Sequence, residues 1–170
     1  MLKYKLTTQD LQTHKGFQWE IGKKVTTNGS GELCSRGWLH CYTHPLLAVL
    51  FNRAHADIEN PKLFEVEVGG ECKKEKGLKE GYTEMTLLRE IELPTVTYTQ
   101  KIAFGILCKK QVCKTKEWNK RADNWLNGKG RDRDDLYICM YYVAYYAAYN
   151  AVINNDSINL IEIAEEAMKY

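Results

Sequence analysis

The sequence predicts an α+β protein in which a β-rich N-terminal part precedes a helical C-terminal part. Residues 1–94 contain several segments in which apolar and polar side chains alternate, which is the period of a half-buried strand. Residues 95–170 instead carry apolar residues at helical spacing. Strands followed by helices are typical of α+β rather than alternating α/β folds. We therefore expect a mostly antiparallel sheet with one inserted helix, followed by a bundle of about four helices.

The strands of the first part are expected in "LKYKL", "FQWEI", "LFEVEV" and "YTEMTLLREIEL". The Gly- and Lys-rich stretch "GGECKKEKGLKEG" (69–81) is expected to form an exposed, mobile hairpin or loop. One helix interrupts the strands in "THPLLAVLFNRAHA". Thr43 or His44 can act as its N-cap, and Pro45 suits the first turn because its missing N–H costs nothing there.

Four helices are expected in the second part, in "TQKIAFGILCKKQVC", "TKEWNKRADNWLNG", "RDDLYICMYYVAYYAAYNAVINN" and "SINLIEIAEEAMKY". Asp134 and Asp135 suit the first turn of the third helix, because the helix dipole favours negative charge there. Ser157 is the expected N-cap of the last helix.

The composition is that of an ordinary globular protein, with 44% apolar and 27% charged residues in a chain of 170. The net charge of +2 gives by itself no reason to expect a nucleic-acid partner. The start "MLKYK" lacks the apolar region of a signal peptide, and no run approaches the roughly 18 apolar residues of a membrane-spanning helix. We therefore expect an intracellular protein whose six cysteines are reduced thiols, with no membrane partner.

The stretch "GWLHCYTHPLLAVLF" (37–51) concentrates potential metal ligands and nucleophiles. His40 and His44 have a usable spacing for zinc, but no C-x-x-C pair accompanies them, and the strand neighbours His40 and Cys41 point to opposite faces. No signature of a catalytic cysteine or serine, and no phosphate-binding glycine loop, is present. We favour a strand-to-helix corner without metal or cofactor. Its pocket is expected to be lined by His40, Tyr42, Thr43, His44 and, from a later strand, Glu90.

The segment from Lys109 to Arg133 is basic, with nine Lys and Arg against three acids and a local net charge of +6. Basic residues interleaved with Trp118 and Trp125 can grip phosphates and stack bases. The alternative, which we favour, is that both tryptophans face a core and the bases form the solvated side. Arg131 and Arg133 could instead contact an anionic ligand at the start of the following helix.

Tyrosines line the third C-terminal helix, where Tyr137, Tyr141, Tyr145 and Tyr149 form one ridge at four-residue spacing. Alanines on the same helix leave room for close helix packing. Such a helix is either central to a bundle or offered to a partner, because tyrosine buries area while keeping a hydroxyl. Two alternatives therefore remain for these tyrosines, Trp118 and Trp125. They form a core, or they form an interface with a partner or, in a homo-oligomer, with a second copy of the chain.

The segments "GFQWEIG", "CSRGWLHCYTHPL", "LFEVEVGGE" and "TEMTLLREIELP" resemble an uncharacterised domain found in bacteriophage and prophage proteins, over about residues 13–94. The segment "EWNKRADNWLNGKGRDRD" is similar to helical extensions of such proteins. In this chain Tyr42 stands where the second cysteine of the pattern would be. The resemblance implies a phage accessory protein acting in the host cytoplasm, with 1–94 as the phage-type domain and 95–170 as a helical region.

A remoter similarity is to the split sheet of ADP-ribosyltransferase-like proteins. It implies that Lys5 or Thr7, Tyr42 or Thr43, and Glu90 or Glu92 would surround NAD. Two functions therefore follow as expectations. The first is a non-enzymatic binder or inhibitor of a host defence factor or of a signalling nucleotide. The second is an ADP-ribosyltransferase-like enzyme.

Overall fold

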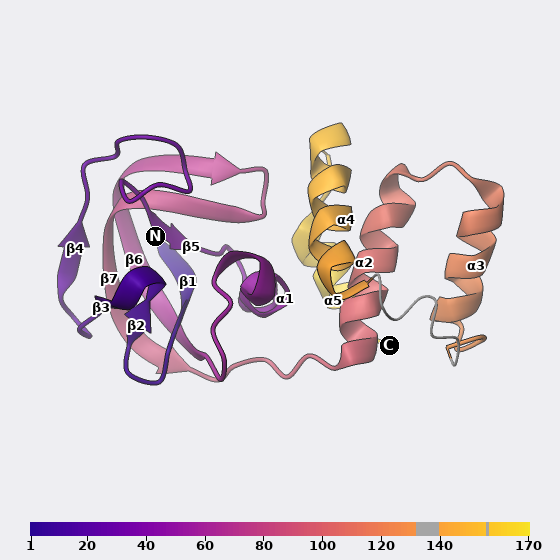
Figure 1. Ribbon diagram of the computed structural model, residues 1–170, viewed down its shortest axis with the longest axis horizontal. Helices are drawn as coiled ribbons and strands as arrows, with labels where there is room; N and C mark the ends of the chain where they lie inside the picture. The colour runs from indigo at the N-terminus through magenta and orange to yellow at the C-terminus, as the bar shows by residue number, and fades with distance from the viewer. Residues whose placement is uncertain (132–139, 156) are drawn as a thin grey trace. The chain divides into compact units, whose positions relative to one another are not determined.

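The structure is a computed structural model that describes residues 1–131, 140–155 and 157–170. The chain divides into two compact units, Met1–Thr95 and Val96–Tyr170, and each is described by itself (Figure 1). The predicted α+β class is confirmed, because an antiparallel sheet with an inserted helix precedes a group of helices. Among the described residues, no helix is both long enough and apolar enough to span a membrane.

Unit 1 contains seven strands, one 3-10 turn and one α-helix. In chain order these are β1 (Leu2–Thr7), β2 (Gln12–Thr13), η1 (His14–Gly16), β3 (Phe17–Gln18), β4 (Lys24–Thr26), β5 (Leu39–Cys41), α1 (Pro45–His55), β6 (Lys62–Glu75) and β7 (Lys79–Ile91). The strand expected in "FQWEI" is therefore shorter than predicted, because pairing with β2 ends after Gln18.

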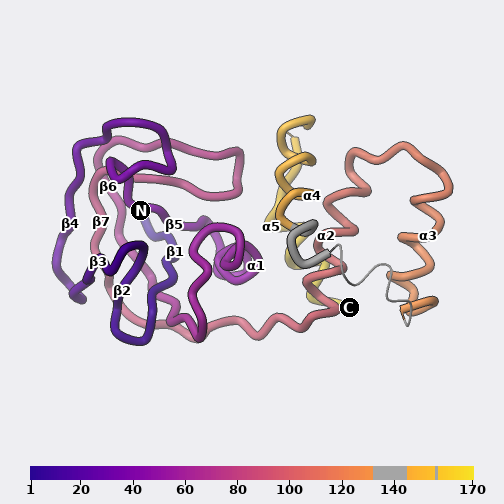
Figure 2. Tube along the Cα trace, viewed as in Figure 1, coloured from indigo at the N-terminus to yellow at the C-terminus, as the bar shows by residue number. Residues whose placement is uncertain are grey.

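The main sheet of unit 1 closes on itself. Antiparallel pairing runs from β1 to β6 and from β6 to β7, and the far edge of β7 pairs first with β5 and then with β4. Just after β5, Tyr42 exchanges two backbone hydrogen bonds with Tyr4 of β1, at 2.8 and 3.0 Å. The ring β1–β6–β7–β5–β1 is therefore complete, and the long curved hairpin of β6 and β7 forms much of its wall (Figure 2).

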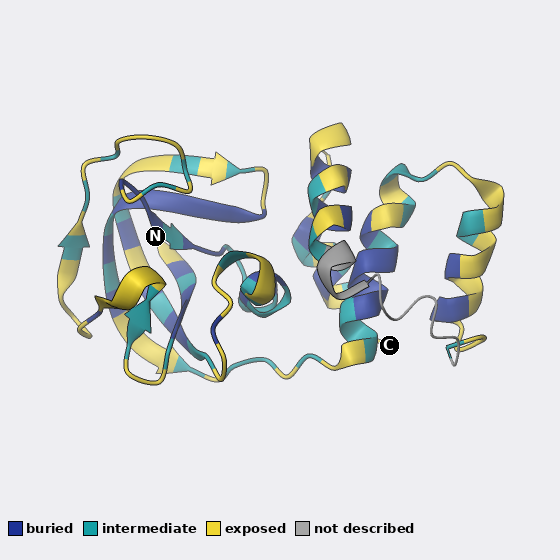
Figure 3. Ribbon diagram, in the orientation of Figure 1, coloured by how far each residue is buried: buried dark blue, intermediate teal, exposed yellow. Residues whose placement is uncertain are grey.

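The inner face of this closed sheet holds a hydrophobic core. Its largest fully buried members include Trp19, Phe64 and Met85. Buried residues alternate with less buried ones along residues 64–68 of β6, and Figure 3 colours the described residues by burial. A closed sheet supplies a protected interior because each strand contributes every second side chain to it.

The prediction of an exposed hairpin or loop over residues 69–81 is confirmed for the hairpin and wrong for the exposure of residues 79–81. β6 continues to Glu75 and β7 begins at Lys79, so only a short turn separates them, with Lys76 and Gly77 at positive φ. Lys79, Glu80 and Gly81 are buried. The reason is tertiary, because β5 pairs with residues 80–82 and covers an edge that a free hairpin would leave in water.

Helix α1 begins as the sequence predicts. Of the two expected N-caps, it is His44 that takes the position, and its Nδ1 accepts a hydrogen bond from the backbone N–H of Leu46 at 3.3 Å. The helix buries Leu47 and Phe51 and packs against β1.

Unit 2 contains α2 (Tyr98–Val112), α3 (Lys116–Leu126), α4 (Met140–Asn154) and α5 (Leu160–Ala167). Helix α2 starts with a capping box between Thr97 and Gln100 and is buried on most sides, because α3, α4 and α5 all contact it. The N-cap of α5 is Asn159 rather than the predicted Ser157, whose hydroxyl instead donates to Asn155. The expected first turn with Asp134 and Asp135 lies outside the described residues.

Candidate functional site

His40, the centre of the predicted pocket, forms a structural hydrogen bond. Its Nε2 hydrogen-bonds the backbone carbonyl of Leu33 in the loop before β5. Burial is the main cause that lowers its pKa to about 4, so the ring is neutral at physiological pH. In this position it fastens the loop to the strand.

Tyr42 and His44 occupy the corner that the sequence predicts, and both contact α1. The Tyr42 hydroxyl lies 3.3 Å from Nδ1 of His55 and the two rings stack. His44 is the helix cap, and Thr43 between them is half-buried. These side chains connect the end of β5 to the helix.

Glu90 is not brought to this corner. On β7 it lies opposite Phe64 of β6, is exposed, and forms an ion pair with Lys62 at 3.5 Å. Gly81, which pairs with His40, precedes Glu90 by nine residues on the same strand. The structure therefore places Tyr42, Thr43 and His44 at the corner directly after His40, and it pairs Glu90 with Lys62.

The buried histidines predict an acid-sensitive fold. The pKa of His40 is lowered to about 4 and that of His55 to about 3, mainly by burial, from an ordinary 6.5. The unfolded chain therefore takes up protons at these rings below about pH 6.5 while the folded chain does not. Their contribution is complete above pH 6.5 and is lost progressively as the pH falls towards about 4. We expect the free energy of unfolding, measured by urea titration, to decrease steadily over this range.

A double variant His40→Gln/His55→Gln should flatten that pH dependence, whereas His14→Gln, at an exposed position, should not. An unchanged slope in the double variant would show that other groups cause the acid sensitivity.

The structure reveals a polar group inside the closed sheet that the sequence analysis did not identify. We call it the inner cluster. Cys41 of β5 lies opposite Glu80 of β7 in the strand register, and Cys72 of β6 lies opposite Tyr82. Side chains from four strands thus meet: Lys3, Lys5, Cys41, Cys72, Glu80 and Tyr82.

Glu80 is the centre of the inner cluster. Its Oε2 accepts from Lys3 Nζ at 2.7 Å and from the Tyr82 hydroxyl at 2.9 Å. Burial opposes ionisation of this carboxyl, but the hydrogen bonds from Lys3 and Tyr82 prevail and hold its pKa below 4.5. Oε1 lies 3.6 Å from Lys74, whose side chain is 66% exposed. One end of the inner cluster therefore reaches solvent.

Lys5 extends the inner cluster towards the core. Its Nζ donates to the carbonyl of His40 at 2.7 Å and lies 4.8 Å from the centroid of the Trp19 ring. Among the described residues no carboxylate pairs with it. Burial lowers its pKa from 10.5 to about 8, so it is still largely protonated at neutral pH. A cation is thus held in the interior without an anionic counterpart.

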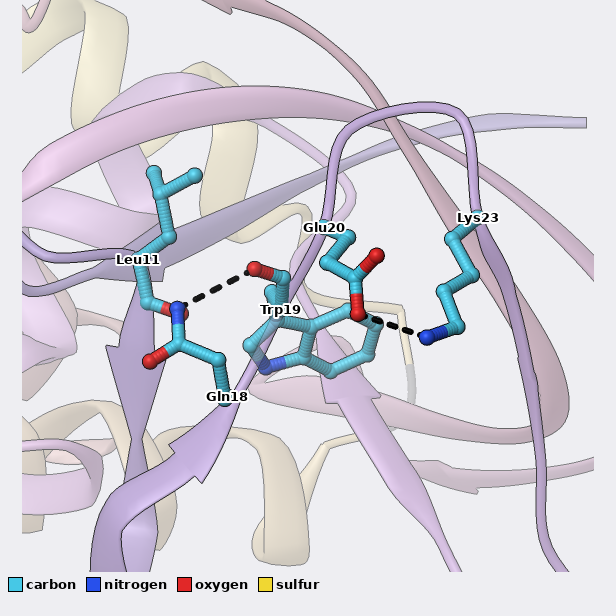
Figure 4. Close-up of polar contacts among 5 residues, drawn as sticks. All are labelled: Leu11, Gln18, Trp19, Glu20 and Lys23. Atoms are coloured by element: carbon cyan, nitrogen blue, oxygen red, sulfur yellow. Dashed lines mark hydrogen bonds and ion pairs between the residues drawn. The ribbon is translucent and has the colours of Figure 1, made fainter.

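Trp19 is fixed in place by the segment around it. Its indole N–H donates to Thr13 at 2.9 Å and its backbone N–H donates to the Leu11 carbonyl at 2.9 Å. Figure 4 shows the Gln18 amide donating to the Trp19 carbonyl and the nearby ion pair of Lys23 with Glu20. The ring that faces Lys5 is therefore rigidly positioned.

The charges of the interior do not balance. Of the four charged side chains buried in the described part of the chain, Lys3, Lys5 and Lys79 are positive and only Glu80 is negative. Lys79 has its own partner, Glu75, at 3.4 Å. Lys3 and Lys5 together outweigh Glu80, so the inner cluster carries a net positive charge that favours an anion.

The Cys41 thiol of the inner cluster is a poor candidate for catalysis. Burial raises the pKa of Cys41 to about 12, and a protonated thiol is a weak nucleophile. Burial also raises the pKa of Tyr82, with further contributions from Cys72 and Glu80. Within the described residues no group of three His, Cys, Asp or Glu side chains could hold a metal ion.

The predicted interface residues of unit 2 differ in how far they are buried. Trp125 is 2% exposed and belongs to the core, whereas Trp118 is half-buried. Tyr145 and Tyr149 are half-buried on α4 and stack at 6.1 Å, while the buried residues among those described on that helix are alanines and Val152. Tyr137 and the side chain of Tyr141 lie outside the described residues.

Of the two predicted anion-binding arginines, Arg131 is among the described residues. Arg131 donates to the carbonyls of Trp125 and Leu126, at 2.9 and 3.1 Å, and its guanidinium lies over the Trp125 ring. It therefore satisfies the end of α3. Arg133 lies outside the described residues.

The features of unit 1 define a class: a small closed antiparallel sheet with one helix and a basic polar interior. Residues 1–99 match the family described as Domain of unknown function (DUF7666), which covers more than half of the chain, and the protein belongs to that family. No curated protein and no solved structure matches the chain. The family description assigns no activity, so the expected phage origin stays a prediction.

Proposed function

We propose that unit 1 is a non-enzymatic binding module for a small phosphorylated ligand, of the size and charge of a signalling nucleotide. The observation that carries this proposal is the unbalanced positive charge of the inner cluster. Lys5 is buried without a carboxylate, and Lys3 shares Glu80 with Tyr82 and Lys74. A phosphate group would supply the missing negative charge and accept hydrogen bonds from the lysines.

The arrangement supports entry from one end of the cluster. Lys74 is largely exposed and Cys72 is exposed, so a ligand would first meet the Glu80 end. An anion displacing the Lys3–Glu80 contact would be drawn further in by Lys5. Binding inside low-dielectric surroundings strengthens such contacts relative to surface ones.

The ADP-ribosyltransferase-like alternative receives no support from the geometry. Lys5 lies inside the closed sheet, Tyr42 stacks on His55, and Glu90 is exposed and paired with Lys62. The side chains of Lys5, Tyr42 and Glu90 therefore engage different partners. An accessory protein that sequesters a nucleotide would also fit the expected role against a host defence. A host-protein partner or an oligomer formed through the tyrosines stays a prediction.

The test is a thermal-shift series on the full chain with NAD, ADP-ribose, cyclic nucleotides and inorganic phosphate. A ligand at 100 times its dissociation constant stabilises a folded protein by about 2.7 kcal/mol, so a shift of several degrees is expected for at least one compound. The shift should disappear in Lys5→Met and persist in Lys23→Met, a matched substitution on the surface of the same unit. Recovery of the ligand unchanged would distinguish a binder from an enzyme.

The proposal fails if none of these anions changes the melting temperature. It fails equally if Lys5→Met and Lys23→Met show the same shift, because the anion would then be bound elsewhere.

A further inference from the structure

Unit 2 carries a basic surface where α2 ends and α3 runs. We define the basic surface by its exposed lysines and arginine and by one tryptophan: Lys109, Lys114, Lys116, Lys120, Arg121 and Trp118. The two acids of this region are Glu117 and Asp123, and Asp123 is already paired with Lys110. None of the five basic residues forms an ion pair with another residue in the described part of the chain. The positive charge is thus offered to solvent.

Trp118 distinguishes this surface from an ordinary solvated helix face. The sequence interpretation placed both tryptophans against a core, and that holds for Trp125, at 2% exposed. Trp118 is only half-buried, and the ammonium group of Lys109, from α2, lies 4.7 Å from its ring centroid. Arg121 follows three positions later on α3, which makes it a neighbour of Trp118 on the helix surface. A half-buried aromatic ring therefore has one cation over it and a second nearby on the helix surface.

The remaining bases extend this arrangement along the helix. Lys116 and Lys120 are four residues apart, so their side chains lie one above the other on α3. Lys116 also begins the helix, where the unsatisfied backbone N–H groups add positive potential. The row of cations can contact successive phosphates of a nucleic acid, and the aromatic ring beside it can stack on an unpaired base.

We propose that the basic surface binds single-stranded nucleic acid, independently of the inner cluster. Lys116, Lys120 and Arg121 contact phosphates, and Trp118 stacks on one base. Unpaired bases are required because a duplex hides its base faces from a side chain lying on a helix surface. Phosphate contacts supply most of the affinity and make it depend on salt.

The test is fluorescence anisotropy of the full chain with a labelled single-stranded oligonucleotide and the matching duplex, at about 50 and about 200 mM salt. We expect tighter binding to the single strand and weaker binding at the higher salt. Lys116→Glu/Lys120→Glu should weaken binding by about ten-fold or more and reduce the salt slope by about 1.4, at about 0.7 per phosphate contact. Lys15→Glu/Lys23→Glu, a matched charge reversal on unit 1, should leave binding unchanged.

Trp118 is tested separately because a half-buried ring also supports the fold. Trp118→Ala should weaken binding by about ten-fold, and Trp118→Phe, which keeps a ring for packing and stacking, by less. Melting temperatures of both variants exclude unfolding as the cause. Absence of binding at the lower salt overturns the proposal, as does full binding by Lys116→Glu/Lys120→Glu. The proposal is also overturned if polyglutamate displaces the labelled oligonucleotide as strongly as unlabelled oligonucleotide does, because the surface would then bind any acidic polymer.

Discussion

Lys5→Met is expected to stabilise the ligand-free protein. Burial lowers the pKa of Lys5 from 10.5 to about 8, which at 1.36 kcal/mol per pKa unit is an unfavourable burial of about 3 kcal/mol. Methionine fills similar space without the charge but gives up the contacts with Trp19 and the His40 carbonyl. The net gain should be about 1–2 kcal/mol, seen as a higher urea midpoint and melting temperature.

The pH dependence gives a second readout of the same change. The burial penalty is complete below about pH 8 and is relieved as the pH rises towards 10.5, because the folded lysine loses its proton before the unfolded one does. The wild-type protein should therefore gain stability over this range relative to Lys5→Met.

Lys3→Met is the matched control, two residues away on the same strand, and its expected effect has the opposite sign. Removing Lys3 leaves the buried Glu80 carboxylate without its closest cation, and breaking a buried pair in this way costs about 3–5 kcal/mol. Some of that loss is offset by Tyr82 and Lys74. If both substitutions destabilised the protein equally, Lys5 would be an ordinary core residue and the case for an anion site would fall.

Gly37→Ala is expected to destabilise unit 1 severely. A Cβ atom at Gly37 would lie 2.1 Å from the carbonyl oxygen of Ser30 and 2.6 Å from its backbone nitrogen. Because these are backbone atoms, no side-chain rotation can relieve the clash. The Gly37 carbonyl also accepts hydrogen bonds from Thr27 and Gly29, so a shift would break the loop's own contacts. We expect a loss of about 3 kcal/mol or more.

The measurement is chemical denaturation of the full chain, followed by tryptophan fluorescence. Gly22→Ala is the matched control, because nothing lies within 4 Å of its added Cβ and only its positive φ is strained. That control should lose about 1 kcal/mol. Equal losses in the two variants would mean that the 27–37 loop shifts to relieve the clash, and that the close approach at Gly37 contributes little to the loss of stability.

The sequence predicts the elements better than it predicts the interior. The helix after Pro45 and the change from strands to helices near residue 95 follow from caps and local periodicity. The alternation in "LKYKL" correctly shows that Lys3 and Lys5 share one face of a strand. It suggests that this face is solvated, whereas both lysines are buried and Leu2 is 55% exposed. In the sequence, the only sign of the inner cluster is the pair of lysines two residues apart. Many surface strands carry the same pattern, so it does not reveal burial.

For the candidate site too, local sequence predicts some features and not others. Local sequence places His40 on a strand and His44 at a helix start, and the structure agrees. Local sequence could not place Glu90 away from them or bring Glu80 to Cys41. That depends on which residues of β7 pair with β5, a register set by contacts some forty residues apart in the chain.

By itself the sequence determined the kinds of element, their order, and the capped start of α1, because each depends on side chains within a few residues of one another. Only the tertiary structure decided that the sheet closes between Tyr4 and Tyr42 and that two lysines consequently lie inside it. Burial is a property of the neighbours that a residue acquires, and in a closed sheet those neighbours come from strands that are distant along the chain.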